Sequence, residues 1–213
     1  MKPNMRNILM IAVLLSILPG CGKIYDWGKD NFYQGQEVEN NMEVARSYIK
    51  SKRVYNQFTI VGQFDALWLS DEARKNYANI YCCRHGKTQE QAHVFLRRQL
   101  EENNHFVAFY VLSLSDIILG DKDSVWSVSL EVGDGSFKPV KIKTIELSPE
   151  YIDIFGKKYN KFKDVYLIYF NAKDVEDKYI ISDTTDPITL LFRSVDKEVE
   201  LVWNLRPCLA LNR

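Results

Sequence analysis

Short segments of alternating apolar and polar residues fill most of the chain after residue 104, and this feature limits the fold more than any other. Turn residues such as Gly133-Asp134-Gly135 and Asp196-Lys197 separate some of these segments. Alternation with a period of two is typical of strands with one buried face, and short connections favour antiparallel pairing. Seven strands are predicted, over residues 54–69, 105–114, 125–132, 138–147, 163–171, 187–194 and 198–204.

Two segments between the first and second predicted strands have the period of a helix. Ser70 is a suitable N-cap for the first helix, and Gly86 is a suitable stop. Thr88 and Gln91 have the spacing of a capping box for the second helix. The sequence therefore predicts an α-hairpin over residues 70–104, inserted between strands 1 and 2.

These elements predict a mainly β protein with a helical insertion. The expected architecture is an immunoglobulin-like antiparallel β-sandwich of about seven strands, with Trp126 and Trp203 in its core. An open barrel is the alternative architecture. Short helices are predicted at residues 43–52 and directly after Ser148. Because no repeat or Gly-, Ser- or Pro-rich linker interrupts residues 46–213, they are expected to form a single domain.

The first 20 residues have the organisation of an export signal. Lys2 and Arg6 give a positive start, and an apolar run over residues 8–18 follows until Pro19 and Gly20 interrupt it. A helix that spans a bilayer needs about 20 apolar residues, so this run is too short for a permanent membrane span. Residues 1–20 are therefore predicted to be a cleaved signal peptide.

The end of this segment, Leu18-Pro19-Gly20-Cys21, resembles the lipobox of bacterial lipoprotein precursors. The resemblance implies attachment of a diacylglyceryl group to the Cys21 thiol, cleavage before Cys21 and acylation of the new amino group. Residues 21–45 would then be the lipidated cysteine and a tether, and the membrane would be a partner through the lipid anchor. Gly22, in place of an acidic residue, implies the periplasmic face of an outer membrane. The alternative is an ordinary secretory signal in which Cys21 has no role.

Charge and composition exclude several classes of protein. The chain has 28 basic and 28 acidic residues, and loss of Lys2 and Arg6 with the signal leaves 26 basic and 28 acidic residues, a formal charge of −2. This balance argues against a nucleic-acid partner. A chain that is 46% hydrophobic and 13% aromatic is also unlike a disordered protein.

Three cysteines remain if Cys21 is lipidated: Cys82, Cys83 and Cys208. Export permits disulfide bonds. Adjacent Cys82 and Cys83 would pair with each other only through a strained ring. Two alternatives are therefore left open: either one of them is bridged to Cys208, or all three are reduced.

Neither of two candidate metal sites has a recognised ligand pattern. The only cluster of soft ligands is Cys82, Cys83, His85 and His93, whose spacing differs from that of a zinc knuckle. Two loops are rich in acidic residues that calcium could use, but interleaved lysines favour solvated loops. No metal and no other cofactor is predicted. The acidic residues of these loops are Asp116, Asp121, Asp123, Asp174, Glu176, Asp177, Asp183 and Asp186.

The chain also lacks the common motifs of nucleophilic and phosphate chemistry. It has no Gly-x-Ser-x-Gly or His-Glu-x-x-His sequence and no phosphate-binding glycine loop, and it has only three histidines. No catalytic residue is predicted, and the protein is not expected to be an enzyme. The expected function is a membrane-anchored envelope lipoprotein that acts as a non-catalytic interaction or assembly module for an envelope protein partner. The alternatives are a ligand- or metal-binding periplasmic carrier and an envelope hydrolase.

Overall fold

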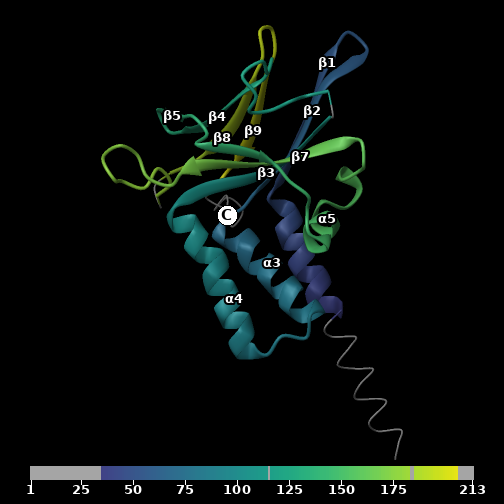
Figure 1. Ribbon diagram of the computed structural model, residues 1–213, viewed down its shortest axis with the longest axis vertical. Coiled ribbons are helices and arrows are strands. Elements are labelled where there is room, and N and C mark those ends of the chain that lie inside the picture. Colours follow the sequence, from purple (N-terminus) through teal and green to yellow (C-terminus); the bar gives the residue numbers. More distant parts are fainter. Residues whose placement is uncertain (1–34, 115, 183–184, 206–213) are drawn as a thin grey trace, which may run out of the picture. The chain divides into compact units, whose positions relative to one another are not determined.

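The computed structural model describes residues 35–114, 116–182 and 185–205. The described residues from Asn41 onward belong to one compact unit. This unit is rich in β-structure, with two antiparallel sheets of five and four strands (Figure 1). The prediction of a mainly β protein with a helical insertion is confirmed at this level.

Neighbouring strands in both sheets run antiparallel. The five-stranded sheet has the order β1 (Ile49–Asn56), β2 (Thr59–Trp68), β3 (Phe106–Leu114), β7 (Lys163–Asn171) and β6 (Lys141–Thr144). The four-stranded sheet has the order β5 (Gly135–Phe137), β4 (Ser127–Val132), β8 (Ile188–Arg193) and β9 (Glu198–Trp203).

The two sheets pack face to face around one apolar core. Phe64 of β2 stacks on Phe192 of β8 with ring centroids 4.2 Å apart, and Phe109 of β3 contacts Trp203 of β9 at 5.3 Å. Trp126 and Trp203 are both buried, as the sequence predicts. Alternation along the strands therefore directs one set of side chains into the space between the sheets.

Helices cover part of the other face of the five-stranded sheet (Figure 1). Tyr151 of α5 (Pro149–Phe155) packs edge-on against Tyr110 of β3 and stacks on Tyr77 of α3 (Asp71–Arg84), with centroids 4.6 and 4.2 Å apart. Residues 35–47 are also helical, and Arg46 donates from Nε to the carbonyl of Ile154 in α5 at 3.3 Å. The helical elements with named bounds are α3 (Asp71–Arg84), α4 (Gln89–Glu101), η2 (Glu102–Asn104), α5 (Pro149–Phe155) and η3 (Gly156–Lys158).

The predicted α-hairpin is confirmed as α3 and α4. The Ser70 side chain accepts from the backbone N–H of Ala73, and Thr88 and Gln91 form the expected capping box. Its place in the strand order was wrong, because the predicted strand 54–69 is in fact β1 and β2, with a turn at Gln57-Phe58. The α-hairpin consequently lies between the second and third strands.

Two further predictions need correction. The helix expected at residues 43–52 ends instead at residue 47, and β1 begins at Ile49, where pairing with β2 fixes an extended backbone. The described part of the chain has nine strands rather than about seven, because β1 and the short β5 were not foreseen.

The strand order also differs from that of an immunoglobulin domain. There, the first, second, fifth and fourth strands form one sheet and the third strand belongs to the other. Here β1, β2 and β3 are neighbours in one sheet. The α-hairpin runs out and back, so β3 starts where β2 ends and pairs with it directly. The structure thus shows a two-sheet antiparallel sandwich without the immunoglobulin strand order.

Candidate functional site

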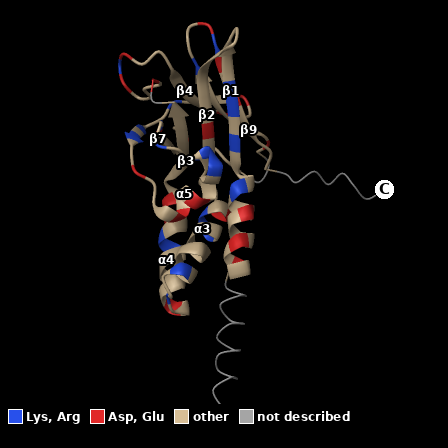
Figure 2. Ribbon diagram, turned by 90° about the vertical axis from the view of Figure 1, so that its right-hand side faces the viewer, with Lys and Arg blue, Asp and Glu red and all other residues tan. Residues whose placement is uncertain are grey.

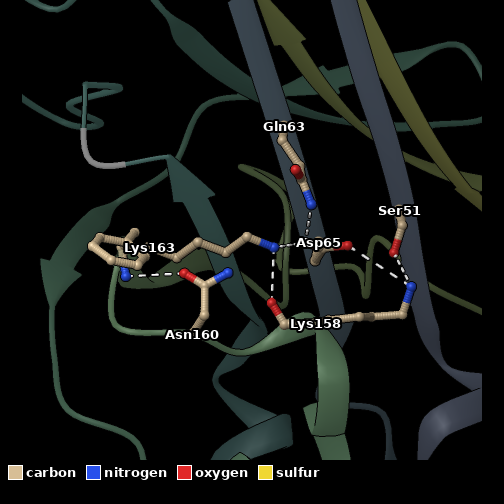
Figure 3. Close-up of polar contacts among 7 residues, drawn as sticks. Ser51, Gln63, Asp65, Lys158, Asn160 and Lys163 are labelled. Carbon is tan, nitrogen blue, oxygen red and sulfur yellow. Dashed lines mark hydrogen bonds and ion pairs between the residues drawn. The ribbon is translucent and has the colours of Figure 1, made fainter. Parts of the chain in front are cut away.

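A buried ion pair lies on the outer face of the five-stranded sheet, away from the core between the sheets (Figure 3). Asp65 of β2 is 2% exposed, and Lys163, the first residue of β7, is 8% exposed. Lys163 Nζ donates to Asp65 Oδ2 at 2.6 Å and to the backbone carbonyl of Lys158 at 2.8 Å. Two full charges are therefore held inside the domain, where an unpaired charge is costly.

The local sequence explains this placement. Phe64 points into the core between the sheets, so its neighbour Asp65 points to the outer face. Helix α5 ends at Phe155, and its C-cap Gly156 has a φ of +53°, which turns the chain out of the helix. The Asn160 side chain then accepts from the backbone N–H of Phe162 at 2.9 Å, which closes the turn before Lys163.

Further donors surround the Asp65 carboxylate. Gln63 donates to Oδ2 from Nε2 at 3.2 Å, and Lys158 Nζ lies 3.8 Å from Oδ1. The Lys158 ammonium also donates to Ser51 Oγ on β1 at 2.6 Å, so it bridges two strands (Figure 3). The Asp65 carboxylate thus takes these contacts from groups of the domain itself.

This pair forms the floor of a groove of about 680 Å³. Arg53 of β1 and Lys157 of η3 form its basic rim, and both side chains are exposed. Lys52 also lines the groove and is exposed, but it pairs with Phe64, so its side chain leaves β1 on the face opposite to that of Arg53. Figure 2 shows basic positions along β1 beside the acidic position on β2. Two aromatic side chains, Tyr55 at 50% exposure and Phe162 at 68%, complete the opening.

The groove is strongly cationic. Its lining includes five basic side chains and one carboxylate. Lys52, Arg53 and Lys157 form no ion pair with any described residue. Ammonium and guanidinium groups that line one groove bind carboxylates or phosphates, and the adjoining rings add apolar contact. The arrangement can therefore hold an anionic group.

Of the sequence-predicted cysteines, the structure describes two. Cys82 is buried in α3, and burial raises the pKa of its thiol. Cys83 is half-buried. Cys21 and Cys208 lie outside the described residues, so the lipidation and the two disulfide alternatives stay predictions.

The soft-ligand cluster is not assembled in the described part of the chain. His85 packs on the Tyr81 ring with centroids 4.2 Å apart, and its Nε2 lies 3.4 Å from Oε1 of buried Glu150. His93 lies on α4 beside a different hollow. Among residues 35–205, apart from the undescribed positions, no three His, Cys, Asp or Glu side chains are placed to hold a metal ion.

The acidic loop over residues 173–178 is organised by contacts within the loop itself. Asp174 Oδ1 accepts from the backbone N–H groups of Glu176 and Lys178 at 2.8 and 3.0 Å. Lys173 Nζ pairs with Asp177 at 3.0 Å. These contacts fit the prediction of a solvated loop. Asp183, which belongs to the same predicted group, lies outside the described residues.

Comparison of the chain with protein-family models, curated proteins and solved structures found no match in any of the three. None of the helices in the described part of the chain has the length and apolar character needed to cross a bilayer. The case for function therefore rests on the sequence and on the geometry of the groove.

Sequence reasoning missed the groove. Asp65 and Lys163 are 98 positions apart, and neither residue type is a signal by itself. One signal was present: four lysines fall between residues 157 and 163, directly after a predicted helical turn. A basic segment of this density marks a candidate anion site.

Proposed function

We propose that the chain is a lipid-anchored lipoprotein of a bacterial cell envelope that binds an acidic segment of an envelope protein. The lipobox-like sequence ending at Cys21 supports the anchor, and Gly22 supports the periplasmic face of the outer membrane. The cationic groove supports the binding role. The observation that carries the proposal is the excess of five basic side chains over one carboxylate in this groove.

The rim charges have no evident role in holding the fold together. Lys163 and Lys158 are engaged by Asp65, whereas Lys52, Arg53 and Lys157 gather at the opening without an acidic partner in the described chain. Cationic side chains without an acidic partner in the domain attract an acidic partner from outside it, which favours recognition as their role.

The aromatic rim favours a protein partner. Tyr55 and Phe162 expose about half or more of their surfaces beside the lysines. Aromatic and basic residues together are typical of the parts of protein interfaces that contribute most to affinity. Immunoglobulin-like sandwiches also use their sheets as scaffolds for binding surfaces. By analogy, we assign the same scaffold role to the two sheets of this domain.

Binding accounts for the groove better than catalysis. The polar pair closest to a catalytic dyad is Ser51 Oγ and Lys158 Nζ at 2.6 Å. A lysine that activates a serine must be neutral, and such lysines are desolvated or placed next to another cation. Lys158 is instead 43% exposed and lies 3.8 Å from the Asp65 carboxylate. Lys158 therefore lacks the desolvated setting of an activating lysine, and its contact with Asp65 is that of a side chain that holds an anion.

Site-specific photocrosslinking in cells tests the proposal. A benzophenone amino acid replaces Phe162 in the anchored full chain, and an adduct with an acidic envelope protein is expected. Substituting Gln for Lys52, Arg53 and Lys157 should reduce the adduct by about fivefold or more. The matched control carries the same group at Val175, which is fully exposed but does not line the groove.

Two outcomes would contradict this function. Equal adducts from Phe162 and Val175 would show that the groove has no special part in binding. An adduct of the Phe162 position with lipid or glycan alone would contradict a protein partner.

A further inference from the structure

A second hollow, of about 430 Å³, lies at the N-terminal end of α3. It shares no lining residue with the cationic groove. Its size falls in the range of small-molecule sites, about 300 to 1,000 Å³. We call it the aromatic pocket, and its side chains have the opposite electrostatic character from those of the groove.

Aromatic rings form much of its wall. Tyr48 directly precedes β1, Trp68 ends β2 and Phe106 begins β3, so antiparallel pairing of these strands brings the three residues together. Tyr48 and Trp68 meet edge to face with ring centroids 6.4 Å apart. All three are only half-buried, so part of each ring remains uncovered, and Tyr179 adds a fourth ring.

Two carboxylates lie at the same hollow. Asp71 and Glu72 occupy the first turn of α3, line the pocket and are exposed. Asp71 accepts from Asn103 Nδ2 at 2.7 Å, and Glu72 has only a long surface contact of 3.5 Å with Lys75. The N-terminus of α3 contributes about half a positive charge, so the two carboxylates leave the local charge negative.

The Tyr48 phenol reports the same negative field. Burial raises its pKa, and the charge of Glu72 raises it further. The fold also shows how such a ring can meet a cation, since Lys173 Nζ lies 5.1 Å from the centroid of the Tyr179 ring. An anion is disfavoured here, because Ser70 already caps the helix and the carboxylates would repel it.

We propose that the aromatic pocket binds an organic cation with an ammonium group. The ammonium group would lie against the faces of Trp68 and Tyr48, while Glu72 and Asp71 balance its charge. Aromatic faces attract cations through the ring quadrupole. Removing water from an alkylated ammonium group costs less free energy than removing it from a primary one, because the alkylated group is more weakly hydrated. This inference is independent of the groove and of its acidic partner.

Titration of the full chain, purified in a maltoside detergent, tests the proposal. Choline is the first probe, and calorimetry and tryptophan fluorescence at constant ionic strength measure its binding. The control ligand is 3,3-dimethylbutan-1-ol, which has the shape of choline without its charge. Choline is expected to bind about tenfold or more tightly than this alcohol.

A second arm identifies the source of the cation. Nα-acetyl-lysine methylamide presents the same charge as a protein side chain. Tighter binding of this probe assigns the pocket to a lysine of a partner, and tighter binding of choline assigns it to a small amine. If neither probe binds, the proposal is wrong.

Variants separate the pocket from a general charge effect. Glu72→Gln is expected to weaken choline binding by about threefold to tenfold. Glu90→Gln is the matched control, because Glu90 occupies the first turn of α4 and does not line the pocket. Circular dichroism checks that both variants are folded. Equal losses in the two variants, or equal binding of choline and its uncharged analogue, would overturn the assignment.

Discussion

Replacement of Lys163 by Met tests the buried ion pair on which the groove is built. Methionine keeps much of the length of the lysine side chain but removes the charge that Asp65 Oδ2 meets at 2.6 Å. The buried carboxylate would then keep Gln63 at 3.2 Å and Lys158 at 3.8 Å. Loss of one partner of a buried pair costs about 3–5 kcal/mol, and the remaining donors place the expected loss near the lower end.

Lys158→Met is the matched control for this substitution. The Lys158 side chain is 43% exposed and its ammonium group lies at the longer distance from Asp65, so its loss is expected to cost less than about 1 kcal/mol. The double variant Asp65→Leu with Lys163→Met removes both buried charges and should recover much of the stability. Isolated charges are destabilising, whereas apolar side chains can replace a buried pair with little net change.

Urea unfolding at neutral pH, followed by tryptophan fluorescence and circular dichroism, measures these differences. The slope of the transition should stay constant while its midpoint shifts. A loss below about 1 kcal/mol for Lys163→Met would refute the reasoning. A double variant whose loss of unfolding free energy equals the sum of the losses in the two single variants would also refute it.

The other expected outcomes concern the core, the pH dependence and the anchor. Phe64→Ala should cost about 3–5 kcal/mol in the same urea titration, because Phe64 stacks on Phe192 between the sheets; a loss below about 1 kcal/mol would contradict this packing. Burial raises the pKa of Tyr151, so the unfolded chain releases this proton first and stability falls as the pH rises above about 10. Tyr151→Phe should flatten that fall in unfolding titrations between neutral and alkaline pH, and an unchanged slope would argue against it. Cys21→Ala should abolish metabolic labelling with a fatty-acid analogue and release the chain from membranes, whereas retained labelling would disprove lipidation at this residue.

The bounds of two strands could be predicted closely from the sequence. The predicted segment 163–171 is β7 itself, and 198–204 differs from β9 by one residue. In β9 every second side chain is buried, so the alternation that packing requires is visible in the sequence. The capped helices α3 and α4 were predictable for a similar reason, because Ser70 and Thr88 satisfy backbone groups within a few residues.

The first hairpin could not be predicted from local pattern. Gln57-Phe58 forms its turn without the Asn-Gly or Gly-rich sequence that usually marks one. Phe58 continues the alternation in phase with Ile60, so residues 54–69 resemble one strand. In the structure Phe58 is fully exposed. Only the pairing of β1 with β2 separates the two strands.

The groove depends on contacts that no local pattern records. Asp65 lies between Phe64 and Ala66 on a strand whose two faces are both covered at this level. A charged residue in such a place needs a partner, but the sequence does not tell which distant residue supplies it. The partner, Lys163, is brought there by the turn after α5, and the rim is completed by β1, the strand that the sequence missed.

Binding of an oligoglutamate peptide to the full chain in neutral detergent tests the central claim most directly. The groove variant carries Gln at Lys52, Arg53 and Lys157. The control variant carries Gln at three exposed lysines on or beside β6 that do not line the groove: Lys138, Lys141 and Lys143. The two variants therefore have the same net charge. The account predicts that the groove variant loses about tenfold or more in affinity, that the control loses less than about twofold, and that added salt weakens wild-type binding. Equal losses in the two variants, or no binding by the wild-type chain, would contradict it.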